Sequence, residues 1–287
     1  MAESYQSAQI VKTAAGKQYH VGTGPGDVAP SILLVGDPAR AEKVAQHFDE
    51  VTVRRANREY VTLTGTYRGQ PLTVTATGIG CDNTEIAVVE LTQCVEQPTF
   101  LRVGSSGALV EGIGLGDLVI STGAVRLEST STYFVPEGYP AVAHHEVVLA
   151  LVEGAAKVLP AGGRKAHVGL TATAAGFYGA QGRQVPGFPP RDPELPARLG
   201  GLGVLNLEME ASLLFTLARL RGLRAGAVCA IYASRTADQF VDTDAKDAAE
   251  AACIQVGLAA FETLWRMDAA RGQEPAWRPS HGLGAGA

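Results

Sequence analysis

Four short segments of this sequence carry residue types that bind anions, sugars and planar heterocycles. They are GDPAR (36–40), RVGSSG (102–107), FYGAQGR (177–183) and NLEMEA (206–211). Each comes just past an apolar run that predicts a β-strand, so we expect loop chemistry at all four. Because α/β sheets bind ligands beyond the ends of their strands, these segments are candidate parts of one site.

The first two segments suit the binding of an anion. Gly36 lets a ligand approach the backbone, the helix predicted to follow offers free N–H groups, and Arg40 adds a fixed positive charge. Arg102 lies in a run that otherwise predicts a buried strand, and Ser105, Ser106 and two glycines come next. Structural alternatives remain. For the first segment the alternative is a plain strand–helix turn with an exposed arginine, and that segment taken alone favours it. For the second segment the alternative is a salt bridge followed by a turn.

The third and fourth segments offer groups for a base and a sugar. Phe177, Gln181 and Arg183 combine an aromatic face, an amide and a guanidinium, which suit a planar heterocycle with carbonyl oxygens. Glu208 and Glu210 stand at the start of a predicted apolar helix, where the helix dipole favours carboxylates and capping alone would explain them. Their functional interpretation is a carboxylate that binds the vicinal hydroxyls of a sugar.

Alternating apolar runs and amphipathic stretches predict the elements that must position these segments. The predicted strands are 31–36, 60–66, 71–77, 99–104, 117–124, 166–173 and 224–232. The predicted helices are 39–47, 83–96, 146–158, 209–221 and 245–268. We therefore expect the α/β class, as a three-layer α/β/α sandwich with a central mixed β-sheet. Residues 1–287 should form a single domain, with an ordered core over about 16–271, a flexible N-terminus and a flexible C-terminal tail.

Composition limits the classes of partner. The 287 residues carry a net charge of −5, which disfavours binding to nucleic acid or to an anionic membrane. The four cysteines form no C-x-x-C pair, so a zinc site or redox motif is not indicated, and we expect buried thiols. Because no secretory signal or membrane-spanning run is visible, the expected location is the cytoplasm.

Six segments, in this order and spacing, resemble the nucleoside phosphorylase superfamily, and specifically its uridine phosphorylase branch. They are VGDPARAEKVA (35–45), ANREY (56–60), TGIGCDNTEIAVVEL (77–91), FLRVGSSGAL (100–109), FYGAQGR (177–183) and NLEMEAS (206–212). The resemblance extends from about Tyr19 to about Leu264, which is nearly the whole expected core.

The resemblance implies a role for each candidate residue. Phosphate would be bound by Gly36, Arg40, Arg102 and Ser105, with Arg58 coming from a neighbouring subunit. Ribose would be bound by Met209 and Glu210, with His20 coming from the neighbour. The base would be bound by Ser106, Gly107, Phe177, Gln181, Arg183, Glu208 and Arg235. Arg102, Gln181, Arg183 and Glu210 would carry the catalysis.

Three positions depart from the family pattern. Ser105 replaces a phosphate-binding threonine and keeps its hydroxyl, and Leu207 stands where bacterial relatives often have a tyrosine. Some bacterial members bind a monovalent cation at a dimer interface. Glu59 and Ile79 match that site, but Asn83 replaces its serine, so the match is incomplete.

The activity implied is phosphorolysis of uridine to uracil and ribose 1-phosphate by a pentosyltransferase. Inorganic phosphate would be the co-substrate, and no metal or organic cofactor is expected. The partners would be the nucleoside, phosphate and further copies of the chain, in a hexamer of three dimers with shared sites. Alternatives are a purine nucleoside phosphorylase or a nucleosidase on the same fold, or a non-catalytic nucleoside-binding module. Purine members generally place an aspartate where this chain has Arg235, which argues against a purine.

Overall fold

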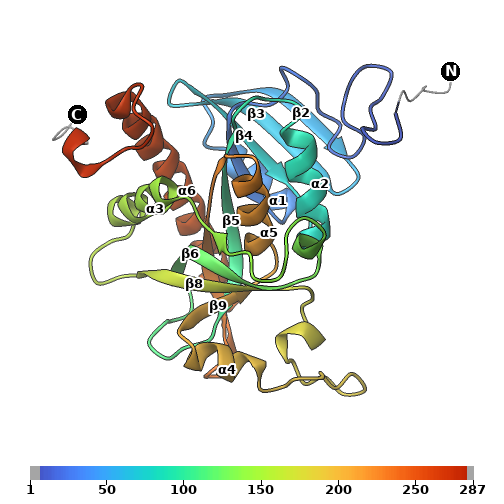
Figure 1. Cartoon of the computed structure of the whole chain (residues 1–287). Coiled ribbons are helices and arrows are strands. Elements are labelled where there is room, and N and C mark those ends of the chain that lie inside the picture. Colours follow the sequence, from blue (N-terminus) through green and yellow to red (C-terminus); the bar gives the residue numbers. More distant parts are fainter. Residues whose placement is uncertain (1–6, 283–287) are drawn as a thin grey trace.

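The predicted strands join into one mixed sheet. The computed structural model describes residues 7–282. Its strands are β1 (Ser31–Val35), β2 (Glu50–Asn57), β3 (Tyr60–Tyr67), β4 (Gln70–Ala76), β5 (Thr99–Ala108), β6 (Leu118–Leu127), β7 (Ala141–Val142), β8 (Ala166–Ala174), β9 (Val204–Glu208), β10 (Arg224–Ser234) and β11 (Gln239–Phe240). They lie in the order β11-β10-β6-β8-β9-β5-β1-β4-β3-β2, with β7 beside β6 (Figure 1). The sheet is mixed because β1 is parallel to β4 and β5, whereas β3 is antiparallel to β2 and β4.

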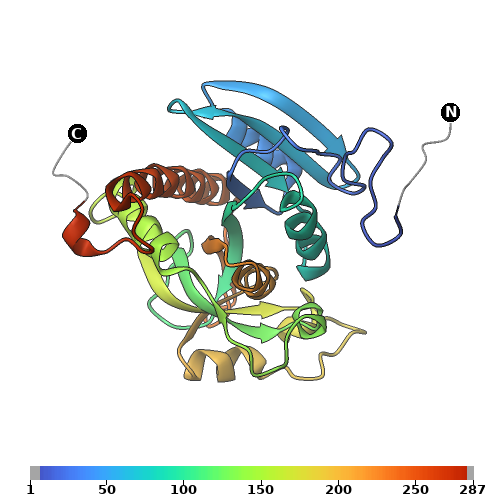
Figure 2. The same cartoon turned by 45° about the horizontal axis from the view of Figure 1, so that its top comes forward.

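Helices cover both faces of this sheet. They are α1 (Pro38–Ala45), α2 (Cys81–Leu91), α3 (His145–Val158), α4 (Leu195–Gly201), α5 (Ala211–Leu220) and α6 (Thr243–Arg271). Along β1, Leu33 and Val35 join a hydrophobic cluster with α1, α3 and α6, whereas Ile32 and Leu34 join a second one with α2 and α5. Figure 2 shows α3 beside α6, with α2 and α5 across the strands from them. This arrangement confirms the expected α/β/α layers.

The sheet also closes on itself, which the sequence did not predict. Strand β10 pairs in parallel with β5 along most of its length and antiparallel with β6. Because β6, β8, β9 and β5 are neighbours in that order, the pairing of β10 with β5 completes a ring of five strands. The strand ends that carry three of the four candidate segments are thereby brought around one opening.

Five labelled elements were missed, namely β2, β7, β9, β11 and α4, and several boundaries were wrong. Strand β2 was overlooked because it is a sheet edge whose arginines resemble a solvated run, and its residues are alternately exposed and half-buried. Strand β9 and helix α4 were also overlooked. The apolar helix was predicted from residue 209, but α5 begins at Ala211 because Asn206–Glu208 pair with neighbouring strands. Strand β5 was predicted to end at residue 104, but it continues to Ala108.

Packing continues beyond the expected C-terminal limit near residue 271. The backbone N–H of Trp277 donates to Glu146 Oε1 at 2.8 Å, and the Trp277 ring packs against the cluster of α1, α3 and α6. At the other end, Lys12 and Gln18 form an isolated bridge. The outermost parts of the two predicted flexible termini, residues 1–6 and 283–287, lie outside the described residues. Within residues 7–282, no helix combines the length and apolarity needed to cross a membrane.

Candidate active site

A cavity of about 770 Å³ opens where several strands end. Most of the residues that the sequence proposed for a site line it. They are Gly36, Arg40, Glu59, Ile79, Asn83, Arg102, Ser105, Ser106, Gly107, Phe177, Gln181, Arg183, Glu208, Met209 and Glu210. His20, Arg58 and Arg235 do not line it. The four candidate segments, separated by up to 170 residues of sequence, therefore meet at one cavity.

Arg40 is held rigidly at the cavity wall. Its Nε donates to Glu250 Oε2 at 3.0 Å and its Nη1 to the carbonyl oxygen of Val103 at 3.3 Å. Burial alone would lower the pKa of Arg40, but Tyr232 and Glu250 outweigh that effect and raise the pKa. The result is a permanent, oriented positive charge, which an anion in the cavity could meet. The alternative of an exposed arginine after a plain turn is wrong, because the Arg40 side chain is only 7% exposed.

Arg102 is the second cation of the cavity. It donates from Nε to Glu208 Oε2 at 3.2 Å and from Nη2 to Glu210 Oε2. Burial opposes its charge, yet the carboxylates of Glu210 and Glu208 raise the pKa of Arg102. A Cβ at position 104 would stand 2.9 Å from Arg102 Nη2, so Gly104 leaves room for the guanidinium. The salt bridge considered as an alternative for Arg102 is therefore present, and its residues line the cavity.

Ser105, Ser106 and Gly107 lie within β5, not in a loop after it. Expecting a loop here was wrong because β10 pairs with β5 as far as Ala108, with a shift in register after Ser106. Pairing along this edge keeps the backbone extended. The two hydroxyls are therefore carried by a strand, which fixes their positions more tightly than a loop would.

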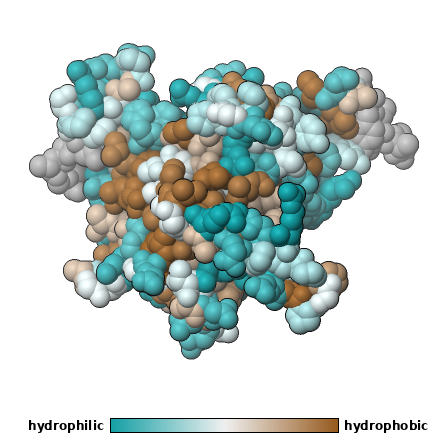
Figure 3. Space-filling view, turned by 60° about the horizontal axis from the view of Figure 1, so that its bottom comes forward, coloured by the Kyte–Doolittle hydropathy of each residue, from teal (hydrophilic) through white to brown (hydrophobic). Residues whose placement is uncertain are grey.

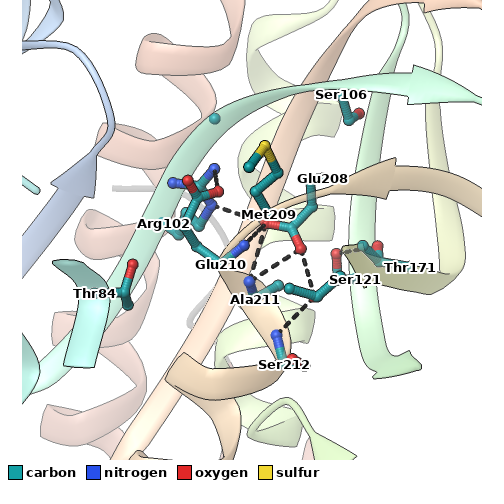
Figure 4. A network of polar contacts seen from close by, with 12 residues as sticks. Thr84, Arg102, Ser106, Ser121, Thr171, Glu208, Met209, Glu210, Ala211 and Ser212 are labelled. Carbon is teal, nitrogen blue, oxygen red and sulfur yellow. Dashed lines mark hydrogen bonds and ion pairs between the residues drawn. The ribbon is translucent and has the colours of Figure 1, made fainter. Parts of the chain in front are cut away.

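Glu208 and Glu210 have different functions in the local structure. The carboxylate of Glu208 accepts hydrogen bonds from the backbone N–H groups of Glu210 and Ala211 and from Thr173 Oγ1, so it caps α5 (Figure 4). The sequence left helix capping open as an alternative for both glutamates. In the structure, Glu208 is the one that caps α5. Glu210 accepts from Arg102 and, at 2.7 Å, from the backbone N–H of Gly80. Its carboxylate lies at the cavity and is available to a sugar hydroxyl.

An aromatic ring and an arginine form another wall, with a second arginine behind it. The guanidinium carbon of Arg183 lies 4.0 Å from the centre of the Phe177 ring, and its Nε donates to the Phe177 carbonyl oxygen at 3.1 Å. Burial, together with the charge of Arg235, lowers the pKa of Arg183. Arg235 donates to the Gln181 carbonyl oxygen at 3.1 Å, behind the cavity wall. Among the described residues, nothing bonds the side-chain amide of Gln181, which leaves it free for a ligand.

His20 and Arg58 lie together and do not themselves line the cavity. His20 Nδ1 is 2.6 Å from Glu90 Oε1, and Asn57 Nδ2 donates to the carbonyl oxygen of His20 at 2.8 Å. Arg58, in the turn between β2 and β3, lies over the ring of Tyr19, with its guanidinium 5.4 Å from the ring centre. The two residues thus belong to one surface formed by the N-terminal segment and the β2–β3 turn.

Several lining residues carried no recognisable signal in the sequence. They are Tyr232, Ala233, Phe240 and Lys246. Tyr232 and Ala233 lie in the last part of β10, which was predicted only as a buried strand. Lys246 lies in the first turns of α6, where a lysine is ordinarily a solvated surface residue. The closure of β10 onto β5, together with the placement of α6, brings these residues beside the candidate segments.

The cysteines and acidic residues form no metal site in the described part of the chain. Cys81, Cys94, Cys229 and Cys253 are free thiols, and all four are buried, as we expected. Across residues 7–282, no group of three or more His, Cys, Asp or Glu side chains could hold a metal ion.

Comparison with known proteins gives the family. Residues 30–262 match the model of the phosphorylase superfamily. A uridine phosphorylase of Thermococcus kodakarensis is 44% identical over 283 residues, covering 97% of this chain and 99% of that protein. One of Escherichia coli is 35% identical over 255 residues, covering 86% of this chain and 97% of that protein. A solved structure of a Trypanosoma brucei nucleoside phosphorylase, described as showing uridine phosphorylase activity, has a TM-score of 0.80 and 26% identity, covering 87% of this chain and 98% of that one.

These matches confirm the resemblance found from the six sequence segments. The family model spans every candidate segment, from Gly36 to Ala211, and the relatives align over nearly their full lengths. The chain therefore belongs to the phosphorylase superfamily.

Proposed function

We propose that this chain is a uridine phosphorylase, which uses inorganic phosphate to break the N-glycosidic bond of uridine and forms uracil and ribose 1-phosphate. The observation that carries the proposal is the single cavity where Arg40 and Arg102 face Glu210, Gln181 and Arg183. The relatives named above support the same substrate over a purine nucleoside, a hydrolytic reaction or a binding module.

Phosphate would occupy the side of the cavity that holds the two fixed cations. Gly36 and Ser105 line the cavity together with Arg40 and Arg102, and offer a close backbone approach and a hydroxyl. Bound there, phosphate would face C1′ of the ribose as the attacking group. Because its charge is already balanced by oriented arginines, little reorganisation is needed when the sugar becomes oxocarbenium-like.

Glu210 and Met209 would hold the ribose. A carboxylate oxygen can accept from the 2′ and 3′ hydroxyls, and the ion pair with Arg102 keeps the Glu210 carboxylate oriented. The sugar would thus be fixed by the same carboxylate that contacts a phosphate-binding arginine. This arrangement aligns C1′ with the incoming phosphate oxygen.

Gln181 and Arg183 would bind the uracil, with Phe177, Ser106 and Gly107 beside it. As the glycosidic bond breaks, negative charge moves onto the two carbonyl oxygens of the base. A guanidinium and an amide N–H stabilise that charge more strongly in the transition state than in the bound substrate. Arg235 would act from behind this wall, through its contact with Gln181. Glu208 would act through its contact with Arg102.

We further propose that the reaction needs no metal and no organic cofactor. Phosphate supplies the nucleophile, and the arginines supply the positive charge that a metal ion would otherwise bring. A monovalent cation at Glu59, Ile79 and Asn83 would have to be bound with an asparagine in place of the serine. We place the enzyme in the cytoplasm, in the salvage and breakdown of pyrimidine nucleosides.

We propose that the active unit is a dimer in which each chain completes the other's site. His20 and Arg58 share one surface and do not line their own cavity, so they are available to a neighbour. Three such dimers would make the hexamer that the family resemblance implies. Exposed apolar side chains on α3, β7 and β8 supply surface for such contacts. They are Val142, Leu149, Val152, Val168 and Leu170. Figure 3 shows hydrophobic residues gathered over part of the face that it presents.

A panel of nucleosides in phosphate buffer tests the choice of base. Uridine, 2′-deoxyuridine, thymidine, cytidine, inosine and guanosine are each incubated with the purified chain, and the free base is measured by chromatography. We expect uridine to be cleaved with a kcat/KM at least about a hundredfold above that for inosine and guanosine, because a purine leaves without carbonyl groups in the same positions. A faster release of hypoxanthine or guanine would contradict the assignment.

A further inference from the structure

A line of hydrogen-bonded side chains crosses four strands and ends at the cavity. Ser121 Oγ lies 2.6 Å from Thr171 Oγ1, which donates to Asn206 Oδ1 at 2.7 Å. Asn206 Nδ2 then donates to Ser106 Oγ at 2.8 Å. The four residues lie on β6, β8, β9 and β5, which are neighbours in that order. Ser121, Thr171 and Asn206 are fully buried, and only Ser106 reaches the cavity.

One direction of this line pairs every buried hydroxyl hydrogen, whereas the other leaves one of them without an acceptor. Because Thr171 gives its hydroxyl hydrogen to Asn206, Ser121 must donate to Thr171. If the Asn206 amide were turned round, Thr171 would have to donate to Ser121. The hydrogen of Ser121 would then have no acceptor among residues 7–282, in a place that water does not reach. The observed orientation instead leaves the free hydrogen on Ser106.

The Ser106 hydroxyl is therefore fixed as a donor toward the cavity. Its oxygen already accepts from Asn206, so its hydrogen points away from that bond. Figure 4 shows Ser121 and Thr171 side by side on neighbouring strands, and Ser106 on β5. Asn206 bonds to both Thr171 and Ser106. A hydroxyl in solution has both of its acceptor sites open, but on Ser106 one of them is already filled by Asn206 and the hydrogen is unused before any ligand arrives.

We propose that Asn206, with Thr171 and Ser121 behind it, is a positioning residue that makes Ser106 a preset hydrogen-bond donor to an acceptor atom of the bound nucleoside. This inference rests on the function proposed above. A uracil base presents carbonyl oxygens that gain negative charge as the glycosidic bond breaks. A donor that needs no reorientation binds such an oxygen more strongly in the transition state, so its effect falls mainly on kcat.

A double-mutant cycle on Ser106 and Thr171 tests the proposal. Ser106→Ala should lower kcat/KM for uridine roughly tenfold, because one donor to the reacting base is lost. Thr171→Val keeps the shape of the buried side chain but breaks the line, and should lower kcat/KM roughly threefold to tenfold. In the Ser106→Ala background the same change should have an effect within about twofold, since Thr171 acts only through Ser106. Thr171→Ser restores the hydroxyl and should restore the activity.

A matched control separates this effect from general loss of packing. Thr62 and Thr75 are also fully buried and bonded to each other across neighbouring strands, 3.1 Å apart, but neither lines the cavity. Thr62→Val should leave kcat/KM within about twofold of wild type at an equal loss of thermal stability. Where Thr171→Val fails to fold, Thr171→Ala takes its place in the cycle, because it also removes the hydroxyl that donates to Asn206.

Two outcomes would overturn the inference, and they differ. A wild-type chain that releases no uracil from uridine and phosphate would refute the proposed function, and the role of Asn206 with it. A wild-type chain that releases uracil, while the losses from Ser106→Ala and Thr171→Val simply multiply, would refute the positioning role alone.

Discussion

Glu250, on α6, holds Arg40 of α1 by a hydrogen bond of 3.0 Å from Arg40 Nε to Glu250 Oε2, across 210 residues of sequence. Its other carboxylate oxygen accepts from Lys43 Nζ at 2.5 Å. Both Arg40 and Glu250 are buried, so the pair has little water to replace either partner. One carboxylate thus balances two cations beside the place proposed for phosphate.

Replacing Glu250 by glutamine should destabilise the protein when phosphate is absent. Arg40 would be buried without a counter-charge, which we expect to cost about 2–4 kcal/mol of unfolding free energy. Phosphate should stabilise the variant more than wild type, because the bound anion supplies the missing charge. The measurement is thermal or urea unfolding with and without phosphate. Asp247→Asn is the control, since Asp247 is exposed and also contacts Lys43. Equal unfolding of the two variants would contradict the prediction.

Removing either polar group of the base wall should impair cleavage much more than phosphate binding. Gln181→Ala and Arg183→Ala each remove a donor to a charge-developing oxygen, worth on the order of 2–4 kcal/mol, or roughly 30- to 1,000-fold in kcat/KM for uridine. The KM for phosphate should change far less. Gln184→Ala and Arg191→Ala, at exposed positions of the same segment, should behave as wild type. A Gln181 or Arg183 variant with near-normal uridine turnover would show that the base binds elsewhere.

Mixing two inactive variants tests the shared site. Arg40→Ala removes a cavity residue and Arg58→Ala removes the residue proposed to come from the neighbour, so each variant alone should be nearly inactive. After dissociation and random reassembly of an equal mixture, about half of the dimers contain both chains, and one of their two sites carries neither lesion. Activity should return to about a quarter of wild type.

Arg54→Ala is the control for that experiment, because Arg54 is exposed on β2 and paired with Glu42. This variant should be fully active alone. Subunit exchange is checked by mass spectrometry of differently tagged chains. An exchanged mixture that stays inactive would place Arg58 in its own chain's site or outside any site.

His144 should make stability fall as the pH falls below neutrality. Burial lowers the pKa of His144 to about 4, below its ordinary value of 6.5, while its Nδ1 accepts from the backbone N–H of Glu146 at 3.3 Å. The unfolded chain therefore binds the proton first, and stability is lost between about pH 6.5 and 4, at no more than about 1.4 kcal/mol per pH unit. His144→Asn keeps a helix-capping side chain and should flatten this slope between pH 6.5 and 5.

The neighbouring residue provides the control for the pH experiment. His145 stacks on His144, with ring centres 4.7 Å apart, but it is exposed. His145→Asn should keep the wild-type slope in urea unfolding measured at each pH. A wild-type slope in His144→Asn would mean that His144 is not the group whose protonation destabilises the fold.

Regular apolar patterns predicted most of the sheet and the long helices. Successive side chains of β1 point to opposite faces of the sheet, so Leu33 and Ile32 belong to two different clusters. This local property can be recognised in the sequence. Strand β9 was missed because Asn206 and Glu208 are polar, and polar residues predict exposure. Here they are buried because partners on other strands satisfy them, Thr171 and Ser106 for Asn206 and Thr173 and Arg102 for Glu208.

The same distinction holds for the cavity. Arg40 and Arg102 were identified from the sequence, because a cation beside a glycine-rich strand end suggests anion binding. Tyr232 and Lys246 could not be, since they reach the cavity only through the closure of β10 onto β5 and the placement of α6. The different tasks of Glu208 and Glu210 depend on which carboxylate lies near the N–H groups of α5, and the shared segment NLEMEA does not specify that.

The need for phosphate is the most direct test of the central claim. Uridine is incubated with the purified chain, freed of phosphate, with and without phosphate labelled with ¹⁸O on its oxygens, and with EDTA throughout. Uracil is measured by absorbance and the sugar product by mass spectrometry. We predict uracil and labelled ribose 1-phosphate in equal amounts with phosphate, and no release without it. Equal release of uracil without phosphate, together with free ribose, would contradict the account.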